Sequence, residues 1–92
     1  MQGNPAAKAA PNWRQEHERA IVTEFFSLLS IPNIASDTAN IRTNAQSNQQ
    51  LMERRGVKTR LLEVPGAPPL VYGETLKPGA TRTVVIYAHY DG

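Results

Sequence analysis

The N-terminal third of the chain carries apolar residues at helical spacing. Between residues 13 and 29 they fall near one stripe, with charged residues opposite, as is typical of an amphipathic helix; the stripe holds Trp13, Ala20, Ile21, Phe25, Leu28 and Leu29. Asn12 is the expected N-cap, and Gln15 stands where a capping box needs it. Pro32 disfavours helical geometry in the residue before it. The pattern predicts a helix from Trp13 to Leu29.

A second, more polar helix is expected from Ala39 to Arg55. Its apolar stripe is thin and consists of Ile41, Ala45, Leu51 and Met52. Residues 36–38 are Ser, Asp and Thr, which are good N-caps, and Gly56 suits the position just beyond the helix. A helix this polar is expected to pack one narrow face on a sheet and expose the rest.

The next residues change to the alternating pattern of strands. Residues 57–64 alternate apolar and polar positions, and residues 70–75 form a second short run. Between them, the proline-rich segment 65–69 is a turn. The two runs predict an antiparallel hairpin with a wide loop. A further turn is expected at residues 76–80, where Pro78-Gly79 suits type II geometry.

The last ten residues, TVVIYAHYDG, combine an apolar run with a polar end. Val84 to Tyr87 are β-branched or aromatic without a break, which favours a strand buried on both faces, as in the middle of a parallel sheet. The run ends at His89, and ligands of open α/β sheets bind beyond the carboxyl ends of the strands. This end of the chain is therefore the candidate site.

His89 and Asp91 have the spacing of a cooperating pair. Residues two apart in an extended chain point to the same side and lie about 6.6 Å apart, so Tyr90 is expected on the other side. Neutral imidazole is a common metal ligand, and a nearby carboxylate can hold its tautomer and raise its basicity. The alternative is that His-x-Asp is only the polar end of a strand.

Several segments of the sequence resemble motifs of the co-catalytic zinc peptidases and deacylases. This family includes carnosine dipeptidase, glutamate carboxypeptidase, acetylornithine deacetylase and succinyl-diaminopimelate desuccinylase. TVVIYAHYDG is similar to their apolar strand followed by His-x-Asp. EFFSLLSIPNIASDTANIR resembles their first helix and the loop into the second, and RRGVKTRLLEV with PPLVYGETLKPGATR resembles their first strands. The resemblance covers residues 13–92.

The resemblance implies an α/β fold. Two N-terminal helices, a β-hairpin and a buried strand would form the start of a three-layer α/β/α catalytic domain. His89 would be a zinc ligand, and Asp91 would be the catalytic residue that orients it. The family's other ligands, its bridging carboxylate and its general-base glutamate follow later in the sequence. Residues 1–12 are expected to be a flexible leader, and residues 13–92 to be a catalytic domain truncated after its first metal-ligand motif.

The resemblance also implies a reaction. Two zinc ions would activate water to hydrolyse amide bonds of small peptides or N-acyl amino acids. SLLSIPNIASD and YAHYDG are nearer to the dipeptidase and carboxypeptidase branch, which favours peptide cleavage. The parent enzyme would form a homodimer through a domain that this sequence lacks. A catalytic zinc site needs about three protein ligands, and this chain offers one, so we expect the chain alone to be inactive, to bind zinc weakly and to be marginally stable.

Two other interpretations remain open. One is a small non-catalytic α/β module that binds a partner through its sheet edge, and the other is an inactive paralogue that does the same. The feature that discriminates between these and the enzyme is the sequence after Gly92. His17 does not add a site, because RQEHERAI has no second histidine at the spacing of a zinc helix.

The composition of the chain excludes only a few classes of function. The 92 residues carry a net charge of +2 without a basic block, which gives no reason to expect nucleic acid. The absence of cysteine excludes disulfides, thiolate metal sites and cysteine catalysis. No apolar run is long enough to predict a membrane span. The Ala- and Pro-rich start suits the mature end of an exported, periplasmic protein slightly better than a cytoplasmic terminus.

Overall fold

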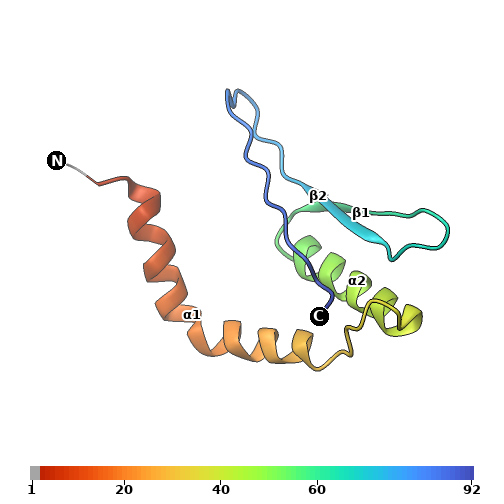
Figure 1. The fold of residues 1–92 in the computed structure, drawn as a ribbon. Helices are drawn as coiled ribbons and strands as arrows, with labels where there is room; N and C mark the ends of the chain where they lie inside the picture. Colours follow the sequence, from red (N-terminus) through yellow and green to blue (C-terminus); the bar gives the residue numbers. More distant parts are fainter. Residues whose placement is uncertain (1–2) are drawn as a thin grey trace. The chain divides into compact units, whose positions relative to one another are not determined.

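The computed structural model describes residues 3–92. In chain order its elements are α1 (Pro5–Leu29), α2 (Thr38–Glu53), β1 (Lys58–Leu62) and β2 (Leu70–Glu74) (Figure 1). They belong to two compact units, which divide after Ser30. The mixed α/β class that the sequence predicted is confirmed. None of the helices in residues 3–92 is both long and apolar enough to cross a bilayer.

Helix α1 begins eight residues earlier than the sequence predicted. Asn4 is the N-cap, and its side chain accepts a hydrogen bond from the Ala6 backbone N–H at 2.9 Å. The expected cap Asn12 and most of the expected leader are therefore helical. Alanine favours helix without any apolar stripe, and proline is well suited to the first helical position; apolar periodicity reflects neither preference. Met1 and Gln2, the start of that leader, lie outside the described residues.

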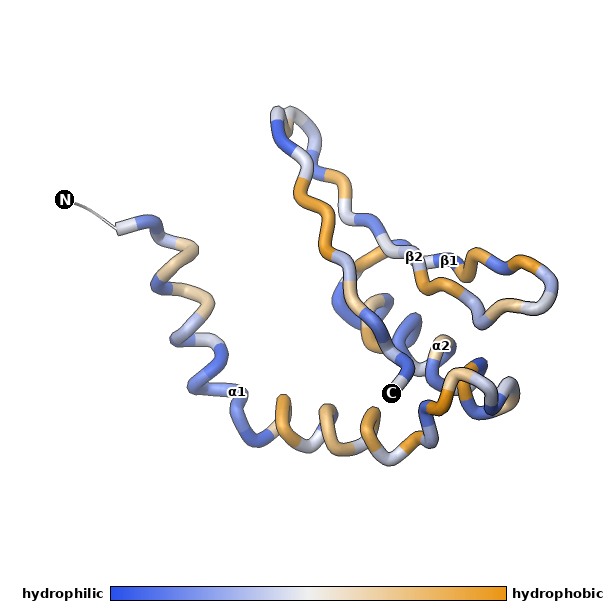
Figure 2. The backbone as a smooth tube through the Cα atoms, viewed as in Figure 1, coloured by the Kyte–Doolittle hydropathy of each residue, from blue (hydrophilic) through white to orange (hydrophobic). Residues whose placement is uncertain are grey.

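Much of the apolar stripe of α1 is exposed, although Ile21 and Leu28 are half-buried. Trp13, Phe25 and Leu29 are all more than half exposed, and Figure 2 shows apolar residues along the C-terminal half of the helix. His17 stacks on the Trp13 ring at 4.0 Å between centroids, and its Nδ1 lies 2.7 Å from the Trp13 carbonyl oxygen. His17 is therefore a half-buried residue of the helix.

Helix α2 supplies the core of the second unit. Its limits agree with the prediction to within two residues, and Gly56 has the positive φ of 79° expected just beyond a helix end. Ile41 and Ala45 are fully buried, while Leu51 and Met52 are half-buried. The narrow apolar face that the sequence predicted therefore packs as expected.

Strands β1 and β2 form the predicted antiparallel hairpin and pack on α2. Arg60 pairs with Tyr72 in the register and lies over its ring on the exposed face, 5.1 Å from the centroid. The other face approaches α2 closely at Gly73, where an added Cβ would lie 2.1 Å from the Met52 terminal carbon. The second predicted turn is also present, since Gly79 has a φ of 79° and the Ala80 N–H donates to the Lys77 carbonyl at 3.1 Å.

The predicted third strand is not formed. Residues 81–92 have no strand assignment, and Val84, Val85 and Ile86 are 83%, 85% and 88% exposed. The expectation of a buried strand ending at His89 is therefore wrong for this structure. The physical reason is that a strand needs a partner for its backbone N–H and C=O groups, and no other segment among residues 3–92 lies along this run in a ladder.

The start of α2 gives a prediction about acid sensitivity. The Asp37 carboxylate accepts hydrogen bonds from the Asn40 side chain at 2.7 Å and the Asn40 backbone N–H at 3.2 Å, and these bonds lower the pKa of Asp37 below its usual value of 3.8. Because its pKa is lowered in the folded state, the ionised Asp37 carboxylate stabilises the folded state above pH 3.8. This stabilisation is lost as the pH falls through the folded-state pKa of Asp37.

We expect Asp37→Ala to destabilise the start of α2 at neutral pH and to remove this part of the acid dependence. Asp37→Asn is the matched control, because asparagine caps a helix without titrating. Amide hydrogen exchange at residues 38–41, measured from pH 3 to 7, checks both variants. A wild-type acid dependence that persists in Asp37→Asn would contradict this assignment.

Candidate metal site

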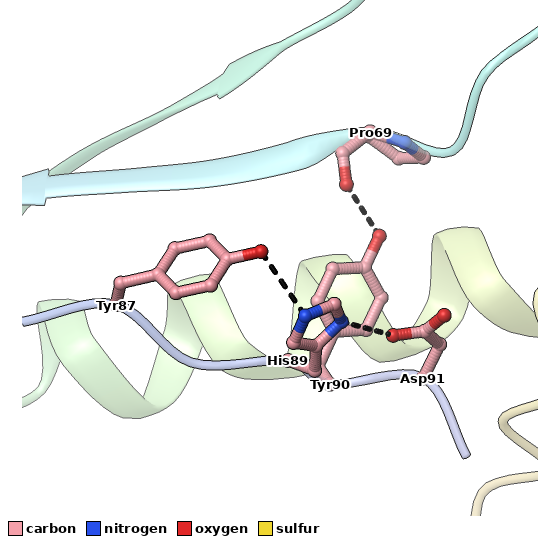
Figure 3. Close-up of polar contacts among 5 residues, drawn as sticks. All are labelled: Pro69, Tyr87, His89, Tyr90 and Asp91. Atoms are coloured by element: carbon pink, nitrogen blue, oxygen red, sulfur yellow. Dashed lines mark hydrogen bonds and ion pairs between the residues drawn. The ribbon is translucent and has the colours of Figure 1, made fainter.

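The candidate site lies on the extended segment 87–91 and consists of Tyr87, His89 and Asp91; we call it the His89 site (Figure 3). His89 Nδ1 lies 3.1 Å from Asp91 Oδ1, and His89 Nε2 lies 3.0 Å from the Tyr87 hydroxyl. The contact between His89 and Asp91 agrees with the predicted placement of both residues on one side of the chain. Tyr90 extends toward Pro69, whose carbonyl its hydroxyl contacts (Figure 3).

The tautomer of His89 follows from these partners. An ionised carboxylate can only accept hydrogen bonds, so Nδ1 carries the proton and donates to Asp91. Nε2 then holds the lone pair, which can bind a metal or accept a hydrogen bond from a hydroxyl. The His89 side chain is 70% exposed and that of Asp91 is 38% exposed, so the site is open to solvent.

Two hydrogen bonds hold this segment against the rest of its unit. The Tyr90 hydroxyl donates to the carbonyl of the buried Pro69, directly before β2 (Figure 3). The Gly92 N–H donates to the Asn33 carbonyl in the loop before α2, at 2.9 Å. Asp91 therefore lies between two anchored residues, and His89 directly precedes the first of them.

Asn44 supports one of these points, and the sequence analysis missed it. Its side-chain amide is 2% exposed and donates to the Pro32 carbonyl at 2.7 Å and to the Asn40 carbonyl at 3.1 Å. It thereby fixes the loop next to Asn33, which holds Gly92. The available signal was helical spacing, since Asn44 follows the buried Ile41 by three positions and so lies on the same face.

The environment of Tyr90 differs from that of an exposed tyrosine. Partial burial, and then the negative charge of Asp91, raise the pKa of Tyr90 above 10.0, and the positive charge of Arg42 acts in the opposite direction. The neutral phenol is the form that donates to Pro69. Because the folded-state pKa is raised, this stabilisation is complete below pH 10 and is lost as the pH rises through the folded-state pKa.

Replacement of Tyr90 tests the importance of its hydroxyl. We expect Tyr90→Phe to cost about 1 kcal/mol, the usual net value of one hydrogen bond, and to accelerate amide exchange at Gly92. Tyr72→Phe is the control, because the Tyr72 hydroxyl donates to Glu74 at 3.0 Å in an exposed hydrogen bond within the hairpin. Equal exchange at Gly92 in the two variants would contradict an anchoring role for Tyr90.

The residues present fit part of a zinc site. His89 Nε2 is a suitable ligand atom, and Asp91 is placed as the outer partner that ligand histidines commonly have. Within the described part of the chain, no group of three His, Cys, Asp or Glu side chains is arranged to hold a metal ion. His17 uses Nδ1 for its own helix and lies in the other unit, and the Asp37 carboxylate is bonded to Asn40.

Comparisons with known proteins add nothing to this geometry: no family model, curated protein or solved structure matches the chain.

Proposed function

We propose that this chain is the N-terminal part of the catalytic domain of a zinc-dependent peptidase, in which His89 binds a metal ion and Asp91 orients His89. The observation that carries the proposal is the 3.1 Å contact between His89 Nδ1 and Asp91 Oδ1. It leaves Nε2 as the nitrogen with a lone pair, directed away from the carboxylate. The motif resemblance over residues 13–92 supplies the reaction class.

In this mechanism the residues of the chain prepare one ligand. Asp91 accepts the Nδ1 proton, holds the imidazole in one tautomer and makes Nε2 more basic. The anchors at Tyr90 and Gly92 limit how far the segment can swing. The metal that His89 would help to hold would supply a Lewis acid and would lower the pKa of a bound water. In this proposal the remaining zinc ligands and the general base come from sequence beyond Gly92. The proposed substrates are small peptides.

The exposed apolar run before His89 supports the same proposal. Val84 to Ile86 are more than 80% exposed and have no strand partner among the described residues. A run of this kind suits an inner strand of a larger sheet, which further strands of a catalytic domain would cover. It also favours one second candidate, a non-catalytic module that pairs this strand with a partner protein.

Sequencing the coding DNA beyond the Gly92 codon tests the proposal. We expect the reading frame to continue and to encode a further Asp and then an adjacent Glu-Glu pair. The expressed product is expected to hydrolyse dipeptides, to lose this activity when a chelator removes the metal, and to recover it with zinc. A stop codon directly after Gly92 would refute the peptidase and leave the partner-binding module.

A further inference from the structure

We infer that Tyr87 is a positioning residue that caps the metal-binding nitrogen of His89 while no metal is bound. The inference rests on the proposed role of His89 as a metal ligand. Since Nδ1 donates to Asp91, the bond at Nε2 is one in which the Tyr87 hydroxyl donates and the nitrogen accepts, over 3.0 Å. The hydroxyl therefore occupies the same lone pair that a zinc ion would use.

Tyr87 can contact His89 because the two residues are only two positions apart in an extended segment. Tyr87, His89 and Asp91 alternate with Ala88 and Tyr90, so the three side chains share one side of the extended segment. The rings of Tyr87 and His89 meet edge to face, 5.4 Å apart at an interplanar angle of 77°. Figure 3 shows the imidazole held between the phenol on one side and the carboxylate on the other.

A hydroxyl and a metal ion cannot share one lone pair, so Tyr87 must release Nε2 before a metal binds. Water competes strongly for this hydrogen bond, because Tyr87 is 79% exposed and the His89 side chain is 70% exposed. The cap is therefore weak and reversible. Together with Asp91 it keeps the imidazole in the tautomer that a metal requires, at a small cost in affinity.

Tyr87→Phe isolates the hydroxyl, because phenylalanine keeps the ring that meets His89 edge to face. Zinc chloride is titrated into the 92-residue chain with ¹⁵N-labelled histidine, at about pH 8, where a free imidazole is neutral. NMR signals of the His89 ring give a site-specific dissociation constant. We expect Tyr87→Phe to bind zinc about two- to tenfold more tightly than wild type, the range that one net hydrogen bond supplies.

Tyr72→Phe is the matched control, because its hydroxyl bonds Glu74 in the hairpin; its zinc affinity at His89 is expected to equal that of wild type. The metal-free spectrum provides a second readout, in which the Nε2 signal shifts in Tyr87→Phe and stays in place in Tyr72→Phe. Equal affinity in wild type and Tyr87→Phe, including no binding by either, would overturn the inference. Failure of the peptidase proposal is recognised separately, by a stop codon after Gly92.

Discussion

Under the proposed function, replacement of His89 with alanine is expected to abolish zinc-dependent hydrolysis by the proposed peptidase and to lower its zinc content. His89 Nε2 is the proposed ligand atom, and Asp91 and Tyr87 are arranged around that imidazole. Loss of an outer partner of a metal ligand typically costs about 10- to 100-fold in metal affinity or activity. We expect Asp91→Ala to fall in that range and His89→Ala to exceed it.

Metal analysis and dipeptide hydrolysis, measured on the same preparations, check this order of effects. His17→Ala is the matched control, because it removes the chain's other histidine, whose Nδ1 bonds the Trp13 carbonyl within α1. Its activity and zinc content are expected to equal those of wild type. A His89→Ala enzyme with full zinc content and normal kcat/KM would show that His89 is not a ligand.

The second large effect, a loss of folding stability, is expected in the core of the second unit, where α2 packs on the hairpin of β1 and β2. Ile41 is 0% exposed and is the largest side chain with so little exposure. Ile→Ala at such a site costs about 2–5 kcal/mol, through lost burial and the cavity that remains. Domains have a stability on the order of 0.1 kcal/mol per residue, so this loss is comparable with the total for a unit of this size. We expect Ile41→Ala to unfold α2 and the hairpin together.

Ile34→Ala is the matched control, because it makes the same substitution at a side chain that is 62% exposed; such surface changes usually stay within about 0.5 kcal/mol. Amide exchange across α2, β1 and β2 measures both. Ile41→Val provides a graded version that keeps the unit folded, with an expected cost of about 0.5–1.5 kcal/mol. Equal protection in Ile41→Ala and Ile34→Ala would show that the unit has no core at Ile41.

Local sequence rules succeeded where an element depends on its own residues. An N-cap of α2 within residues 36–38, the glycine after α2 and the alternation of β1 each depend on residues a few positions apart, and each was predicted; the structure selects Asp37 as the cap. The pairing of His89 with Asp91 also follows from spacing alone. The same rules failed at the start of α1, because the absence of an apolar stripe was treated as the absence of a helix.

The tertiary structure decided what spacing alone could not. It buried Asn44 and gave it the Pro32 carbonyl as a partner across twelve positions, and it tied Tyr90 to Pro69 across twenty-one. It also left Val84 to Ile86 without a ladder, since strand formation depends on a second segment rather than on composition. The sequence by itself determined the pairing of His89 with Asp91, because alternation in an extended chain is local. Only tertiary contacts decided what holds that site in place, because those hydrogen bonds join residues far apart in the chain.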